Sequence, residues 1–147
     1  MTRRLLPVLF AALPMLSAGC ANDLEENGSG VTPPIGMTVS FSADVQPIFD
    51  ANCAFPGCHA PPLTDPPSMD LSAGQARASL VGVQSVESPL ERVAPGDSQA
   101  SYLLHKLLGT QVQAGGSGER MPLGGPYLPD AGIDLIRGWI DQGAVDN

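Results

Sequence analysis

Glycine and proline interrupt this chain so often that only short stretches between them can form regular structure. The 147 residues include 17 glycines and 15 prolines. Proline cannot donate a backbone hydrogen bond and glycine weakens the interior of helices and strands, so both favour turns. Residues 109–127 are rich in glycine and show no periodicity. We therefore predict a fold in which long loops outweigh regular structure.

The first two helical segments are indicated by their caps. Asp44 is expected to cap a helix that runs into Cys53, with Pro47 in its first turn, where the missing N–H is tolerated. Ser72-Ala73-Gly74-Gln75 has the form of a capping box and predicts a short helix that continues through Leu80.

Two further helices are predicted in the second half of the chain. One runs over about 98–108 and is stopped by Gly109, and the last runs over about 129–142 with its proline in the first turn. Strand signals are poor, and only 81–86 and 92–93 suggest extended chain. The pattern favours an all-α fold of about four short helices joined by long Gly/Pro-rich loops.

The first 19 residues are typical of an export signal that is removed. Arg3 and Arg4 precede an apolar run over 5–16, which is too short to span a bilayer. Leu16-Ser17-Ala18-Gly19-Cys20 resembles a bacterial lipobox, which would make Cys20 the lipidated mature N-terminus. Plain secretion is the alternative.

Residues 20–36 contain hardly any large apolar side chain and are expected to form a flexible tether to a domain over 37–147. A lipid on Cys20 would hold that domain at the periplasmic side of a bacterial membrane. Cys53 and Cys58 would then lie outside the cytoplasm, in an oxidising compartment.

The charge balance excludes some partners. The full chain has a net charge of −8, and loss of Arg3 and Arg4 with the leader makes it −10. Nucleic acid and anionic lipid both require a basic face, so neither is expected as the main partner. Few aromatic residues are available for the core, and a domain this small often needs a disulfide, metal or cofactor.

The most specific motif is Cys53-Ala54-Phe55-Pro56-Gly57-Cys58-His59. Two cysteines with a histidine directly after the second are the arrangement for covalent haem attachment. The two thiols must reach two vinyl groups while the next residue places an imidazole under the iron. Pro56-Gly57 can form a turn that absorbs a spacer two residues longer than usual.

Two other interpretations of this motif remain open. A disulfide between Cys53 and Cys58 would close a small ring and leave His59 an ordinary surface residue. Zinc could draw on Cys53, Cys58, His59 and His105, but adjacent residues reach one small ion only with strain.

Met121 is the candidate for the sixth iron position. It lies late in the glycine-rich loop beside Pro122, whereas Met37 adjoins the tether and Met69 is close to His59 in sequence. A long loop can reach the opposite face of a flat cofactor. His105 is the rival ligand, and neighbouring Lys106 is expected to be a solvated charge that complements the helix dipole.

Taken together, these residues resemble class I cytochrome c, most closely the planctomycete-type cytochrome c domains. The matching stretches are Phe41-x-x-Asp44-Val45-x-Pro47-Ile48-Phe49, Cys53…Cys58-His59, Pro95-Gly96-Asp97-x-x-x-Ser101-Tyr102-Leu103-x-x-Lys106, Arg120-Met121-Pro122 and Trp139-Ile140-x-x-Gly143-Ala144.

The resemblance implies one covalent haem c, bonded to Cys53 and Cys58, with His59 as proximal and Met121 as distal ligand. It implies transient electron transfer with redox partner proteins, and no enzymatic activity, because no iron position stays open and no acid–base set is evident. A haem enzyme or sensor from which Met121 dissociates is therefore disfavoured. A haem-free, disulfide-tied binding or structural module with the same fold is the main alternative.

The resemblance also implies how the chain surrounds the cofactor. The first and last helices would cross, with Ile48 or Phe49 near the apolar stripe of the last helix. The second nitrogen of His59 needs an acceptor, which we expect within 60–67. The expected walls of the pocket are Phe55, Leu63, Leu71, Leu103, Leu107, Leu123, Tyr127 and Leu128.

Overall fold

The computed structural model describes residues 37–63 and 69–147. The predicted leader over 1–19, the candidate lipidation site Cys20 and the predicted tether over 20–36 all lie outside the described residues. In the described part, no helix is both long enough and apolar enough to cross a bilayer.

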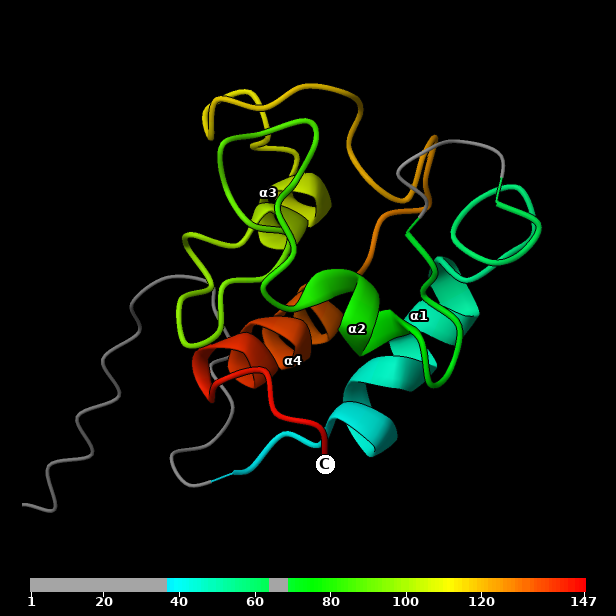
Figure 1. The fold of residues 1–147 in the computed structure, drawn as a ribbon, viewed down its shortest axis with the longest axis vertical. Helices are drawn as coiled ribbons and strands as arrows, with labels where there is room; N and C mark the ends of the chain where they lie inside the picture. Colours follow the sequence, from blue (N-terminus) through cyan, green and yellow to red (C-terminus); the bar gives the residue numbers. More distant parts are fainter. Residues whose placement is uncertain (1–36, 64–68) are drawn as a thin grey trace, which may run out of the picture.

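Five helical elements follow one another along the described residues (Figure 1). They are η1 (Phe41–Val45), α1 (Gln46–Asn52), α2 (Ala76–Leu80), α3 (Tyr102–Leu108) and α4 (Asp130–Asp141). Residues 37–63 and 69–147 form no β-strand, only isolated bridges. The chain is thus mostly helical where it has regular structure, as predicted.

The first helix is capped four residues before the predicted cap, Asp44. Ser40 is the N-cap, since its hydroxyl accepts from the amide of Ala43, and the carboxylate of Asp44 accepts from the amide of Ser40 at 2.8 Å. η1 is a π-helix, in which each backbone hydrogen bond spans five residues, so the amide of Gln46 donates to the carbonyl of Phe41. Pro47 then enters α1 near its start, where a residue without an N–H is tolerated.

The beginnings of α2 and α3 also differ from prediction, because local turns compete with the helix. Ser72 does not cap α2, which is preceded by Gln75 and has no side-chain cap, although the helix ends at Leu80 as predicted. Before α3, the carboxylate of Asp97 accepts from the amide of Ala100 at 2.9 Å. This turn uses 97–100, so α3 starts at Tyr102.

The ends of the later helices follow the predicted pattern. Gly109 terminates α3 in the left-handed conformation, with φ of 77°. Pro129 lies at the N-cap position of α4, just before the first turn in which it was predicted, and the helix spans nearly all of the predicted segment. The two stretches with weak strand signals do pair, since Gly82 donates to the carbonyl of Val93 and Arg92 to that of Val83.

The core lies where η1 and α4 meet. The ring of Phe41 is 4.9 Å from that of Trp139 and 6.3 Å from that of Phe49. Other buried members of the cluster include Val39, Val45, Leu71, Leu80, Val93, Leu104, Leu107, Ile133, Ile136 and Ile140. The first and last helical segments do meet, but the ring contact runs through Phe41 of η1 and Trp139, where Ile48 or Phe49 was predicted. Ile48 instead approaches α4 near its start, at Gly132.

The beginning and end of the described chain are joined. The backbone oxygen of Asn147 accepts from the amide of Ser42 at 3.0 Å and from the hydroxyl of Ser40 at 2.8 Å, and its side-chain oxygen accepts from the amide of Phe41. Figure 1 shows this junction at the lower end of the molecule, while α3 and the loop after it lie at the upper end.

Candidate functional site

The motif from Cys53 to His59 forms one closed turn at the end of α1. Cys53 is the C-cap of the helix and donates to the carbonyl of Phe49 at 2.8 Å. The chain then turns at Gly57, whose φ is +82°, and returns so that the amide of His59 donates to the carbonyl of Cys53 at 3.2 Å. The turn therefore absorbs the four-residue spacer, and the two cysteines and the histidine lie in one short segment.

Both cysteines are free thiols, Cys53 half-buried and Cys58 exposed. Burial raises the pKa of Cys53 from 9.0 to about 11, and the nearby charge of Cys58 adds to the rise. Cys53 is consequently held as the neutral thiol at neutral pH.

His59 is half-buried and is held in its neutral form. Burial lowers the pKa of its imidazole, and the positive charges of Arg92 and Lys106 act in the same direction, while a hydrogen bond to the backbone of Met69 opposes them. The partner of the imidazole is thus Met69, just beyond the 60–67 segment in which we expected it. Neutral imidazole is the form that binds metals.

Met121 lies outside this turn and is attached to the end of α3. Its amide donates to the carbonyl of Lys106 at 2.9 Å, and its side chain is half-buried. The preceding residue, Arg120, donates from Nε to the carbonyl of Leu107 at 2.9 Å. Two carbonyls that the helix end leaves without partners are satisfied in this way.

The imidazole of His105 is engaged on both sides. Its Nδ1 lies 2.9 Å from the hydroxyl of Thr110, and its Nε2 lies 2.9 Å from the carbonyl of Gln99. A ligand to iron or zinc needs a free ring nitrogen, so this geometry disfavours His105 as a rival to Met121. Across 37–63 and 69–147, no three His, Cys, Asp or Glu side chains gather as a metal site would require.

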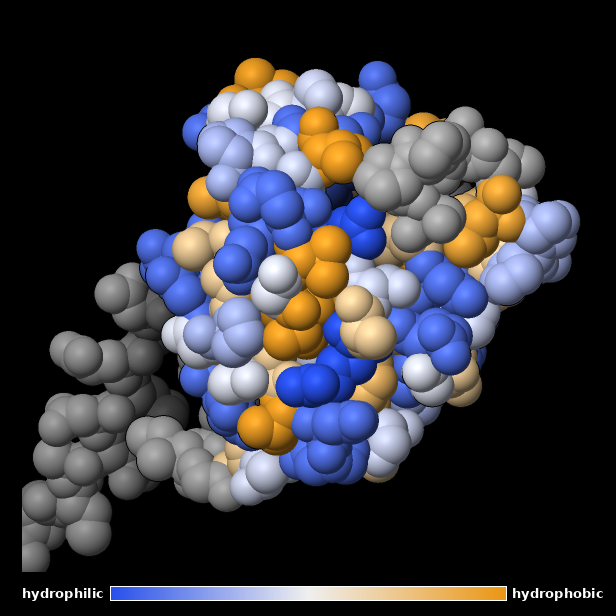
Figure 2. Space-filling model, in the orientation of Figure 1, coloured by the Kyte–Doolittle hydropathy of each residue, from blue (hydrophilic) through white to orange (hydrophobic). Residues whose placement is uncertain are grey.

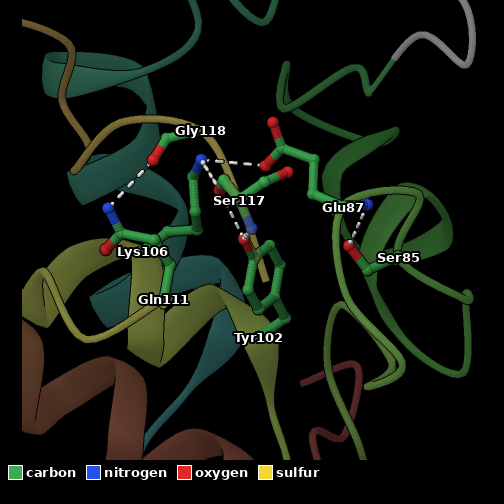
Figure 3. Close-up of polar contacts among 7 residues, drawn as sticks. All are labelled: Ser85, Glu87, Tyr102, Lys106, Gln111, Ser117 and Gly118. Atoms are coloured by element: carbon green, nitrogen blue, oxygen red, sulfur yellow. Dashed lines mark hydrogen bonds and ion pairs between the residues drawn. The ribbon is translucent and has the colours of Figure 1, made fainter. Parts of the chain in front are cut away.

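The prediction that Lys106 is a solvated charge is wrong. Lys106 is only 8% exposed, and its ammonium pairs with the carboxylate of Glu87 at 2.8 Å and donates to the carbonyl of Ser117 at 3.3 Å (Figure 3). The hydroxyl of Tyr102 donates to the same carbonyl at 2.7 Å. Loop 115–118 is therefore hydrogen-bonded to α3 through Ser117. Its carbonyl and the carboxylate of Glu87 are the partners that allow the ammonium of Lys106 to be buried.

Sequence reasoning missed the part played by Glu87 and Tyr102 in this cluster. The signal that could have found it is the run of small residues over 115–118. A β-carbon on Gly116 would stand 2.4 Å from the ring of Tyr102, and one on Gly118 would stand 2.5 Å from Oε1 of Glu87. Glycine at these positions permits the close approach.

The expected pocket walls fall into two groups. Leu71, Leu107 and Leu128 are buried in the core, and Leu63 and Leu103 are half-buried. Phe55, Leu123 and Tyr127 are instead exposed by 45%, 70% and 48%. They belong to the Cys53–His59 turn and to the segment after Met121. On the face that Figure 2 presents, apolar residues form separate patches among polar ones.

Comparison with known proteins provides no relative. No family model matches the chain, and no curated protein or solved structure matches it.

Proposed function

We propose that this protein is a single-haem c-type cytochrome that transfers electrons outside the cytoplasm. The observation that carries the proposal is the Cys53–His59 turn, in which two free thiols and a neutral imidazole follow one another within a single closed loop. In this proposal Cys53 and Cys58 form the thioether bonds, and His59 and Met121 hold the iron from its two faces. Such a protein would be similar to class I cytochrome c, most closely to the planctomycete-type domains.

The chemistry of the donor set supports this assignment. Two thiols and an imidazole spread along one turn suit a broad macrocycle better than a small ion, which needs its ligands gathered around one point. The exposed side chains of Phe55, Leu123 and Tyr127 belong to the two segments that supply the ligands, where an apolar ring would cover them. A bound haem would supply one reversible electron through its iron.

The residues of the chain would each do a defined part of the work. His59 would be oriented by the backbone of Met69, while burial, aided by the positive charges of Arg92 and Lys106, lowers the pKa of its imidazole and favours the neutral form that binds metal. Met121 would favour the reduced metal, because a thioether opposite an imidazole raises the potential. With both positions filled, the protein would act as a carrier and not as an enzyme.

The proposed location and partners of this carrier rest on its N-terminal sequence and on its net charge. The leader over 1–19 and a lipid on Cys20 would place the domain at the periplasmic side of a bacterial membrane. The net charge of −8 for the whole chain would favour redox partner proteins with basic or neutral docking faces, meeting it through small, transient interfaces.

A second candidate is a haem-free binding or structural module tied by a Cys53–Cys58 disulfide. One observation favours it: the charge of Cys58 acts on Cys53, so the two thiols are close within the same turn. Oxidation outside the cell would then close the ring.

One experiment separates the two. The full chain is exported in bacterial cells that attach c-type haem, purified and digested, and the peptide bearing 53–59 is weighed. We expect it to carry one porphyrin, and Cys53→Ser with Cys58→Ser to abolish the attachment. A colourless protein whose 53–59 peptide is two hydrogens lighter, even in these cells, would instead establish the disulfide module.

A further inference from the structure

The segment that carries Met121 is held by very few contacts. Between Arg120 and Tyr127 the sequence is Met-Pro-Leu-Gly-Gly-Pro, with no helix and with two glycines at positive φ. A turn from the amide of Gly125 to the carbonyl of Pro122 at 3.0 Å is its internal hydrogen bond. Such a segment depends on its flanks for a fixed position.

Arg120 joins both flanks of this segment. Its Nε donates to the carbonyl of Leu107 at the C-terminal end of α3, at 2.9 Å, where a positive charge is stabilised by the helix dipole. Its guanidinium also stacks over the ring of Tyr127, with 3.9 Å between the guanidinium carbon and the ring centroid. The side chain of Arg120 thus connects both ends of the segment around Met121, at Arg120 itself and at Tyr127, to α3.

The end of α3 is shaped to receive this side chain. A β-carbon on Gly109 would stand 2.9 Å from Cδ of Arg120, so the absence of a side chain there leaves room for its aliphatic stem. The neighbouring amide of Met121 bonds to Lys106 at 2.9 Å, one carbonyl before the one that Arg120 takes. The two bonds fix the direction in which the chain passes Met121.

We propose that Arg120 is the positioning residue that holds Met121 in place as an iron ligand. This proposal rests on the proposed haem function, but it assigns a role to a residue that does not touch the iron. Arginine is required because a planar guanidinium can donate in its plane and stack on a ring at once, whereas an ammonium offers no such face.

The test uses the full chain, exported and loaded with haem, as Arg120→Ala, Arg120→Lys and the wild type. Imidazole binds the oxidised protein only when Met121 leaves, so its apparent affinity reports the fraction of molecules with Met121 detached. We expect Arg120→Ala to increase that affinity about tenfold and Arg120→Lys to have an intermediate effect. We also expect faster hydrogen exchange at the amide of Met121, a measurement that needs no haem.

Arg77 supplies a matched control. Its Nε donates to the carbonyl of Ala144 at 2.9 Å, so Arg77→Ala removes a bond of the same kind at another place. Equal effects of Arg77→Ala and Arg120→Ala on imidazole binding, or no effect of either, would overturn the role of Arg120. A wild-type protein without haem would overturn the proposed function itself, and exchange at Met121 would still show whether Arg120 holds the segment.

Discussion

The ring of Phe41 packs against the ring of Trp139, with 4.9 Å between their centroids and an angle of 35° between their planes. This contact joins η1 to α4 across most of the sequence. Trp139 is fully buried and donates from its indole nitrogen to the carbonyl of Val145 at 2.9 Å, so the pair fixes the end of the chain as well as the core.

We predict that Phe41→Ala lowers the free energy of unfolding by about 3–5 kcal/mol, because it leaves a cavity against Trp139. Urea denaturation followed by tryptophan fluorescence measures the change. Val112→Ala is the control, since Val112 is 70% exposed and its truncation should cost less than about 0.5 kcal/mol. Similar losses in both variants would contradict the central position of Phe41.

The two cysteines should differ in reactivity in the haem-free protein. The pKa of Cys53 is raised from 9.0 to about 11, so below pH 9 it carries about a hundredfold less thiolate than an ordinary cysteine. Iodoacetamide should therefore modify exposed Cys58 first, and the rate at Cys53 should keep rising up to about pH 11. Peptide mapping measures both rates, and unfolding in urea should make them equal. Equal rates in the folded protein would refute the prediction.

Two glycines should respond in opposite directions to replacement by alanine. At Gly116 the new β-carbon would meet the ring of Tyr102 at 2.4 Å, whereas at Gly132 in α4 its nearest neighbour would be at 3.9 Å. We expect Gly116→Ala to destabilise by about 1–3 kcal/mol and Gly132→Ala to stabilise by up to about 1 kcal/mol. Thermal melts of both variants decide the matter, and a stabilising Gly116→Ala would show that loop 115–118 does not lie against Tyr102.

The ion pair between Lys106 and Glu87 should be asymmetric. The side chain of Lys106 is 10% exposed and that of Glu87 is 40% exposed. Glu87→Ala leaves a buried ammonium without its carboxylate and should cost about 1–3 kcal/mol, whereas Lys106→Met removes the buried charge and should cost less. In the Lys106→Met background, Glu87→Ala should have almost no effect. Additive losses in the double variant would show that the pair is not coupled.

The two candidate distal ligands can be compared in the haem-loaded protein. Met121→Ala should change the visible spectrum and lower the reduction potential, because the thioether is lost. His105→Gln should leave both unchanged, since both nitrogens of His105 are already bonded to Gln99 and Thr110. A spectrum that changes with His105 and not with Met121 would reverse the assignment.

Local sequence rules predicted the helical content and several helix ends. They failed where tertiary contacts determine the start of a helix or the burial of a side chain. Gly109 stops α3 because a left-handed residue suits glycine whatever surrounds it. Pro47 did not reveal where the first helix starts, because the π-helical turn η1 extends the helix to residues ahead of this proline. The burial of Lys106 depends on Glu87 and Ser117, which no periodic pattern connects to it.

The candidate site divides in the same way. The turn from Cys53 to His59 is local, so Pro56-Gly57 was enough to predict that the chain turns there. The hydrogen bond from His59 to Met69 and the attachment of Met121 to α3 depend on how separate loops meet. Residue types suggested Met121 as a ligand, but only the structure showed that neighbouring Arg120 bonds to the carbonyl of Leu107 at the end of α3.

The junction of Asn147 with Ser40 and Ser42 also determines how the molecule can be held. The described chain begins at this same pole, where the side-chain amide of Gln142 donates to the carbonyl of Met37 at 3.0 Å, and the loops that follow α3 lie at the opposite end of the molecule (Figure 1). A surface or bead attached to the protein at this pole would leave the segment between Arg120 and Tyr127 free to contact an electrode or another molecule.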